Sequence, residues 1–189
     1  MNVGIIGAST STPNLTWGDV LITSLNVATE GKGKRWREMT PRNWAQNGLL
    51  LGLLKSSIDE YIAAHPIIDD LNSEYIFLIN SPCGSAATEA EFKADLSYII
   101  DAILIKYPTA KIYIPNGQWN RDDEVRCILY RAWTDDVIAL YPGQCFAGHK
   151  ENIWKEGGDN GATMTYDGGH YSAAGDAECA AQWLTILGY

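Results

Sequence analysis

Residues 74–115, EYIFLINSPCGSAATEAEFKADLSYIIDAILIKYPTAKIYIP, decide the fold of this chain. The first seven of them, 74–80, form an apolar run of the kind found in strands that are covered on both faces. Residues 88–107 carry apolar side chains at helical spacing, and residues 111–115 form a second short apolar run. The order strand, helix, strand predicts two parallel strands joined by a crossover helix.

The same alternation continues on both sides of this unit. Thr88 and Glu91 form a capping-box pattern at the start of the central helix, and Pro108 marks its end. We therefore expect a three-layer α/β/α fold in which a five-stranded parallel sheet carries helices on both faces. The remaining predicted strands are 2–7, 25–29 and 137–141, the remaining helices 16–25, 45–64, 122–133 and 172–187, and the irregular segments 30–41 and 144–166.

Length, composition and charge limit the classes of protein to consider. A chain of 189 residues with 46% apolar and 20% charged residues predicts one globular domain over residues 1–189 rather than a disordered chain. The net charge of −9 argues against a surface for nucleic acid or anionic lipid. The four cysteines lack the paired spacing of metal sites, so we expect reduced thiols and no metal.

The amino-terminal sequence MNVGIIGAST has no charged start followed by a long apolar segment, so no secretion signal is expected there. No apolar run approaches the length of a membrane span. The compartment is left open between the cytoplasm and a larger extracellular or virion assembly.

The sequence DGGHYSAAG, residues 167–175, places a carboxylate three residues before a histidine in a glycine-rich turn that opens an alanine-rich helix. A neutral imidazole at His170 can accept a proton near neutral pH. Asp167 can accept a hydrogen bond from the other ring nitrogen, which fixes the tautomer and stabilises the charged ring. We therefore expect an acid–base pair here.

Ser9 lies in the turn after the first predicted strand, in the sequence Gly7-Ala8-Ser9. A serine hydroxyl becomes a useful nucleophile when a base removes its proton, and His170 is the candidate base. In doubly wound folds the loops after the strands meet at the carboxyl edge of the sheet, where ligands bind. Ser9, Asp167 and His170 are therefore predicted to form a catalytic triad.

Four parts of the chain together resemble the SGNH (GDSL-type) hydrolases. Gly7-Ala8-Ser9 stands where that family has its Gly-Asp-Ser block, and NWAQNG, residues 43–48, is similar to its glycine block. DGGHYSAAG matches the final Asp-x-x-His block, and residues 91–114 have the look of the middle region. The resemblance implies a flavodoxin-like fold and an ester hydrolase that needs no cofactor.

The resemblance also implies an oxyanion hole. Its donors would be the backbone N–H groups of Ser9 and Gly48 and the side chain of Asn80. Two departures from the family pattern stand out: Ala8 replaces the usual aspartate, and residues 80–84 read NSPCG instead of Gly-x-Asn-Asp.

Aromatic and histidine residues outside these blocks are weaker candidates. Trp119 and Trp154 lie in expected loops, where they could stack on a sugar or an aromatic acyl group of a substrate. His65 precedes a proline at a helix end and is expected at the surface. His149 lies in a polar, glycine-bearing segment and could line a pocket, although solvent exposure is the favoured expectation there as well.

The favoured hypothesis is an esterase that forms an acyl-enzyme and releases short acyl groups, such as acetyl, from a carbohydrate or another small ester. Two alternatives remain. The first is a carbohydrate-binding or virion structural module on the same fold, motivated by Ala8 and the irregular third block. The second is a dinucleotide-binding domain, because VGIIGAST resembles the opening of such folds. Pro13 and the lack of a glycine-rich helix start count against the second alternative.

Overall fold

The computed structural model describes residues 1–7, 17–32, 35–38, 51–64, 74–80, 88–116, 124–150, 163–165 and 171–189. Strands and helices alternate along the chain in the order expected for a doubly wound protein. The strands are β1 Asn2–Gly7, β2 Arg37–Glu38, β3 Tyr75–Asn80, β4 Lys111–Ile114 and β5 Cys145–Ala147, and the helices are α1 Trp17–Ala28, α2 Leu51–Ala64, α3 Glu89–Lys106, α4 Glu124–Leu140 and α6 Ala173–Ile186.

The five strands form one parallel sheet in the order β2-β1-β3-β4-β5. This is the flavodoxin-like order, in which the chain reverses its direction of travel across the sheet beside β1. Strands β1 and β3 are paired along their whole length, from Asn2 opposite Tyr75 to Gly7 opposite Asn80. The carboxyl ends of these two central strands therefore lie side by side.

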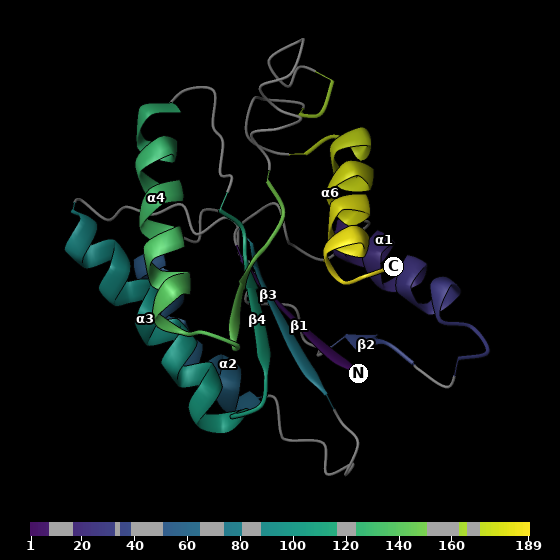
Figure 1. Ribbon diagram of the computed structural model, residues 1–189, viewed down its shortest axis with the longest axis horizontal. Helices are drawn as coiled ribbons and strands as arrows, with labels where there is room; N and C mark the ends of the chain where they lie inside the picture. Colours follow the sequence, from purple (N-terminus) through teal and green to yellow (C-terminus); the bar gives the residue numbers. More distant parts are fainter. Residues whose placement is uncertain are drawn as a thin grey trace.

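Helices cover both faces of the sheet (Figure 1). Helices α2, α3 and α4 pack on one face, around a core that includes Phe77, Phe92 and Tyr130. Helices α1 and α6 pack on the other face, around a core that includes Trp17 and Trp183. Since α1 follows the first strand and α6 closes the chain, this second core joins the beginning of the chain to its end.

The predicted three-layer α/β/α architecture with five parallel strands is confirmed. The central unit forms as expected, with the Thr88 hydroxyl accepting from the Glu91 backbone N–H and the Glu91 carboxylate accepting from the Thr88 backbone N–H. The helix predicted over 45–64 is described from Leu51 onward, and residues 45–50 lie outside the described residues.

The fifth strand was predicted at the wrong place. Residues 137–141 do not form a strand, because α4 runs without interruption from Glu124 to Leu140. Cys127, Tyr130, Thr134 and Val137 are buried at spacings of three and four residues, so Val137 continues the buried stripe of this helix. The edge strand β5 comes later, within the segment expected to be irregular.

The second strand was also misplaced. Residues 25–28 form the end of helix α1, and Thr29 follows in a turn. In this helix Trp17, Leu21 and Leu25 form one buried stripe at four-residue spacing. The actual strand β2 has two residues, Arg37 and Glu38, and lies within the segment 30–41 that was predicted to be a loop. These residues pair with Asn2 and Val3. A strand this short has no periodicity by which the sequence could reveal it.

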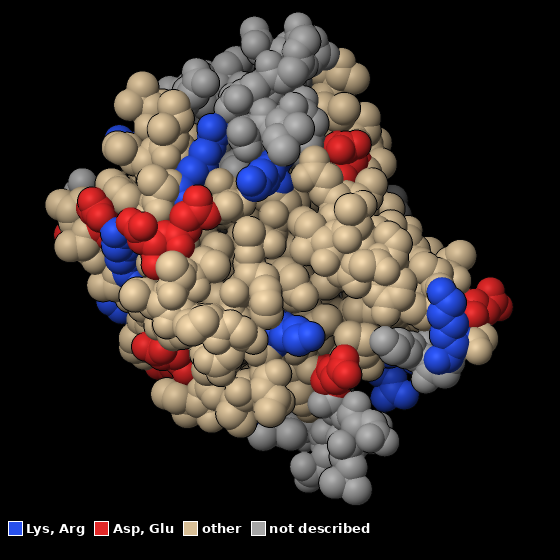
Figure 2. Space-filling view, viewed as in Figure 1, with Lys and Arg blue, Asp and Glu red and all other residues tan. Residues whose placement is uncertain are grey.

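The surface is acidic and mixed in charge. On the face shown in Figure 2, lysine and arginine side chains are interspersed with aspartate and glutamate, without a continuous basic patch among the described side chains. Cys127, Cys145 and Cys179 are buried thiols, and Cys83 lies outside the described residues. None of the helices in the described part of the chain is long and apolar enough to cross a membrane.

The cap of α3 provides a test of the central βαβ unit. Thr88→Ala removes the side-chain acceptor for the Glu91 N–H and is expected to lower the free energy of unfolding by about 1 kcal/mol. Urea unfolding followed by circular dichroism measures the change. Thr109→Ala, at an exposed threonine in the turn before β4, is the control and should change stability little. Equal effects of both substitutions would contradict the assigned cap.

Candidate functional site

The carboxyl edge of the sheet is the place where this topology positions a site. Gly7 and Asn80 end two neighbouring strands in register, directly at the point where the strand order reverses. Ligands of doubly wound proteins bind in the crevice outside such a point. Of the predicted site residues, Asn80 is the one whose backbone is described, as the last residue of β3.

The other predicted site residues lie outside the described residues, so their roles stay predictions. Each of them lies within a few residues of a described segment in the sequence, so the positions of those segments limit where the site can be. These residues are Ser9, Gly48, Trp119, Trp154, Asp167 and His170.

A hydrogen bond joins the two chain ends beside this edge. The backbone N–H of Trp17, the first residue of α1, donates to the Asp176 carboxylate at 2.9 Å. Asp176 lies in the first turn of α6. The first N–H groups of a helix have no partner within the helix, so a carboxylate from α6 acts as a cap for α1. The amino ends of the two helices are thereby held together.

The residues just before α6 are held by backbone pairing. Thr165 and Tyr171 form an antiparallel bridge, and the Ser172 N–H donates to the Met164 carbonyl at 2.8 Å. The Ser172 hydroxyl donates to the Thr163 carbonyl at 2.7 Å and accepts from the Gly175 N–H as the cap of α6. Thr165 and Tyr171, between which Asp167 and His170 lie in the sequence, are therefore held next to each other.

Gly175 is required by the close approach of this pairing segment to α6. A Cβ atom at this position would lie 2.1 Å from the Met164 carbonyl oxygen and 3.1 Å from its carbonyl carbon. Both atoms belong to the backbone, so a side-chain rotation cannot relieve the contact. The glycine of the sequence SAAG thus allows residues 163–165 to lie directly against the first turn of the helix.

His149 is buried, which corrects the expectation of solvent exposure. Its fractional exposure is 0%, and its Nε2 atom lies 3.3 Å from the Tyr171 hydroxyl. Its ring also contacts Trp17 and Trp183, with centroids 6.4 and 5.1 Å away. The sequence around it is polar, but large side chains from distant parts of the chain cover it. Sequence reasoning missed this histidine because the strand before it, β5, was misplaced.

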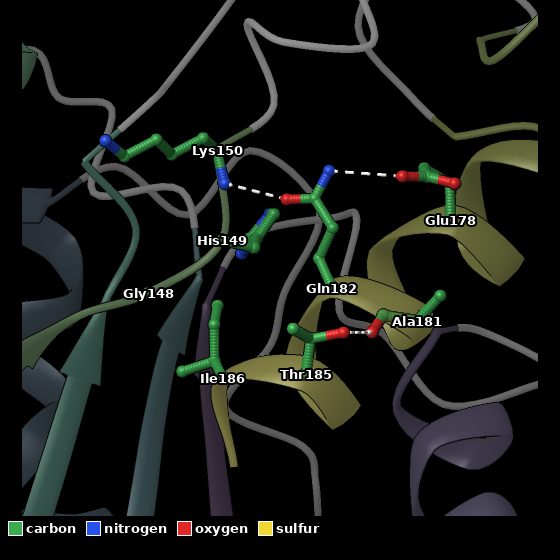
Figure 3. Close-up of a pocket in the computed structure, with 8 residues that line it drawn as sticks. All are labelled: Gly148, His149, Lys150, Glu178, Ala181, Gln182, Thr185 and Ile186. Atoms are coloured by element: carbon green, nitrogen blue, oxygen red, sulfur yellow. Dashed lines mark hydrogen bonds between the residues drawn. The ribbon is translucent and has the colours of Figure 1, made fainter. Parts of the chain in front are cut away.

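A groove runs between the segment after β5 and helix α6 (Figure 3). Its volume is about 370 Å³, and its polar side includes a chain of two hydrogen bonds. The Lys150 N–H donates to Gln182 Oε1 at 3.0 Å, and Gln182 Nε2 donates to Glu178 Oε1 at 3.2 Å. The groove is able to hold a small ligand, and His149 is among the residues that line it.

Asp176 is a second residue that the sequence did not reveal as important. Burial raises the pKa of its carboxyl to about 6, and the nearby charge of Asp19 adds to the rise, whereas the Trp17 hydrogen bond opposes it. Within the described residues, no group of three or more histidine, cysteine, aspartate or glutamate side chains is arranged to hold a metal ion.

Gly175→Ala changes the melting temperature through two opposing effects, the helix propensity of alanine and the contact of its Cβ atom with the Met164 backbone. Alanine has the higher helix propensity by about 1 kcal/mol, so propensity alone would raise the melting temperature. The contact with the Met164 backbone is expected to outweigh this gain and to lower the melting temperature instead. Differential scanning calorimetry gives the sign directly, and a melting temperature above that of the wild type would contradict the close approach.

Asp176→Asn tests the buried carboxyl. Because its folded pKa lies above the ordinary value of 3.8, the folded protein retains the proton between about pH 4 and pH 6 and loses stability as the pH rises through that window. Asparagine keeps an acceptor for the Trp17 N–H without the charge. The variant should therefore gain stability over the wild type at pH 8 and lose this advantage near pH 4.

Melting temperatures of both proteins between pH 4 and pH 8 measure this difference. Glu60→Gln, at an exposed position of α2, removes one negative charge elsewhere and is the control for the change in net charge. A loss of stability in Asp176→Asn that is equal at every pH would contradict the raised pKa.

Comparison with solved structures identifies the fold. The chain superimposes on an acetylxylan esterase from Geobacillus stearothermophilus with a TM-score of 0.72 and 13% identity, covering 100% of this chain and 94% of that one. A lipolytic protein of the G-D-S-L family from Veillonella parvula gives a TM-score of 0.70 and 11% identity over 99% and 98%. A family 3 carbohydrate esterase from Talaromyces cellulolyticus gives 0.70 and 11% over 99% and 96%.

Comparison of sequences found no relative: no protein-family model and no curated protein matches the chain. The structural likeness nevertheless extends over nearly the full length of this chain and of the solved structures. The chain therefore has the flavodoxin-like α/β/α fold of the SGNH (GDSL-type) hydrolases, which confirms at the level of the fold the resemblance seen in its sequence.

Proposed function

We propose that this protein is a single-domain serine ester hydrolase in which Ser9, His170 and Asp167 act as a triad. The observation that carries the proposal is the hydrogen bond between the Trp17 N–H and Asp176. It joins the helix that follows the Ser9 segment to the helix that follows His170, and this supports one shared site for the two segments.

The lengths of the covalent bonds in the backbone limit how far Ser9 and His170 can lie from described residues. Consecutive Cα atoms lie about 3.8 Å apart, so Ser9 is at most about 8 Å from Gly7 at the end of β1. His170 is bonded directly to Tyr171, whose ring packs in the same core as Trp17. The candidate base is thus bonded to a residue of the buried cluster that contains Trp17, and Ser9 lies eight residues before Trp17 in the sequence.

The proposed reaction has two halves. The Ser9 hydroxyl attacks the ester carbonyl carbon while His170 takes its proton, and the collapsing intermediate expels the alcohol, which receives that proton. Water then attacks the acyl-enzyme, gives its proton to His170 and releases the carboxylic acid as Ser9 regains its hydrogen. Asp167 orients the imidazole and stabilises its charged form throughout.

The oxyanion of each intermediate needs hydrogen-bond donors that are already in place. We assign the Ser9 and Gly48 backbone N–H groups and the Asn80 side chain to this role. The register of the sheet supports Asn80, because its backbone ends β3 opposite Gly7, two residues before the nucleophile. The assignment therefore places a donor on the strand adjacent to the serine.

For the substrate we propose a short acyl ester of a carbohydrate or of another small alcohol. Solved structures with this fold include an acetylxylan esterase and a carbohydrate esterase, and this supports acetyl groups on sugars. Trp119 and Trp154 are the candidate stacking residues. The acidic surface makes nucleic acid and anionic membranes poor partners.

Of the two alternatives, the dinucleotide-binding domain is disfavoured. The usual dinucleotide-binding sheet has the order 3-2-1-4-5-6, whereas this sheet has the order 2-1-3-4-5. A non-catalytic binding module on the same fold remains the second candidate, favoured by Ala8 and by the irregular sequence of residues 80–84.

Hydrolysis of p-nitrophenyl acetate tests the proposal. Ser9→Ala is expected to lose roughly 1,000-fold or more in kcat, since removal of the nucleophile leaves only the contribution of binding and the oxyanion hole. Ser11→Ala, a serine two residues further along, is the matched control and should keep the wild-type rate. Acetylated xylan and acetylated monosaccharides then define the alcohol.

Equal rates for the wild type and Ser9→Ala would overturn the role of Ser9. A folded wild-type protein without any esterase activity that still binds a sugar in calorimetry would support the non-catalytic module instead.

A further inference from the structure

His149 is held in place by its backbone on both sides. The Gly148 N–H donates to the Ile114 carbonyl at 2.7 Å, which continues the pairing of β5 with β4. The Lys150 N–H donates to Gln182 on α6 at 3.0 Å (Figure 3). The peptide that carries His149 is therefore clamped between the sheet and the last helix.

Gly148 contributes to this clamp. A Cβ atom at residue 148 would lie 2.6 Å from the Trp183 ring and 2.9 Å from the Pro115 backbone nitrogen. Because Gly148 has no side chain, the Trp183 ring packs directly on the backbone of this residue. The imidazole ring then lies against Trp183, with ring centroids 5.1 Å apart.

The side chain of His149 contacts two residues of functional interest. The Trp17 ring, 6.4 Å away between centroids, belongs to the residue at which the segment after β1 enters α1. The Tyr171 hydroxyl, 3.3 Å from Nε2, belongs to the residue bonded directly to His170. The buried imidazole of His149 thus contacts Trp17, which follows the segment containing Ser9, and Tyr171, which follows the candidate base His170.

We propose that His149 is a positioning residue for the ester hydrolysis, acting through its hydrogen bond to Tyr171. This inference rests on the proposed function of the same site. The bond fixes the Tyr171 ring in the core, and the Thr165–Tyr171 bridge fixes the backbone of the same residue. Both the side chain and the main chain of Tyr171 are therefore held in place. We expect this to fix the orientation of the peptide bond between His170 and Tyr171.

Stability alone does not account for this polar pair. His149 and Tyr171 are 0% and 6% exposed. Tyr171 belongs to the hydrophobic cluster of Trp17 and Trp183, and the His149 ring lies against both of these tryptophans. An apolar pair of the same shape could fill such a site with little loss of stability, because a buried hydrogen bond adds only about 1 kcal/mol net. The hydrogen bond adds a directional requirement to the packing, because Nε2 and the Tyr171 hydroxyl must face each other.

The expected size of the effect follows from the sensitivity of catalysis to geometry. A displacement of about 1 Å of a reacting group can lower the rate by roughly 100-fold. Loss of the bond should therefore lower kcat by roughly 10- to 100-fold. The KM should change by less than about 3-fold, because the substrate is not expected to touch either residue.

Four variants test the proposal. Tyr171→Phe removes one oxygen atom, and His149→Leu removes the imidazole. His149→Gln retains an amide that can hydrogen bond near the position of Nε2, so it should recover part of the lost kcat. Tyr141→Phe is the control, because it removes a phenolic hydrogen bond to Asp101 on the opposite face of the sheet and should leave kcat unchanged.

The measurements are kcat and KM for p-nitrophenyl acetate well below each melting temperature, together with hydrogen exchange of the peptide spanning residues 163–172. Tyr171→Phe and His149→Leu should lower kcat, and the double variant should be no slower than His149→Leu alone. Amide exchange in that peptide should become faster in both single variants, but not in Tyr141→Phe.

An active wild type whose kcat is unchanged in Tyr171→Phe and His149→Leu would overturn this inference and leave the proposed function intact. A loss of kcat in Tyr141→Phe as large as in Tyr171→Phe would also overturn it, since the effect would then reflect general destabilisation. A folded but inert wild type would overturn the proposed function itself, and the positioning role of His149 with it.

Discussion

The hydrogen bond from the Trp17 N–H to the Asp176 carboxylate is the contact on which the candidate site depends. It caps helix α1 with a side chain from helix α6, so the beginning and the end of the chain are joined at their helix termini. The stacked rings of Trp17 and Trp183 reinforce the same junction, with centroids 6.0 Å apart. Helices α1 and α6, which follow Ser9 and His170 in the sequence, are therefore in direct contact.

This junction combines favourable packing with an electrostatic cost. Burial raises the pKa of the Asp176 carboxyl to about 6, so above that pH the folded protein holds a charge in a site that disfavours it. Gly148 and Gly175 allow backbone and ring contacts that a Cβ atom would prevent. The hydrogen bond between His149 and Tyr171 likewise places polar atoms in a core where apolar side chains would suffice. Such local costs are typical of functional sites, where position counts for more than stability.

The sequence was sufficient for the parts of the fold with strong periodicity. The apolar run of β3, the capped helix α3 and the helix after DGGHYSAAG were all predicted within one or two residues. The short edge strands β2 and β5 were missed because two or three residues carry no pattern, and the apolar end of α4 was mistaken for a strand. The burial of His149 was missed because its neighbours Trp17, Tyr171 and Trp183 come from distant parts of the chain. Ser9, Asp167 and His170 were singled out by residue type and spacing, and their roles stay predictions.

Mapping the site of covalent attack tests the central claim most directly. The folded protein is treated with a fluorophosphonate, which reacts with an activated serine, and the modified peptide is identified by mass spectrometry. If the two ends of the chain form one active site, a single adduct should appear on Ser9 in the wild type and should be absent from His170→Ala. An adduct on another serine, labelling of Ser9 that does not need His170, or no adduct at all on the folded protein would contradict the account.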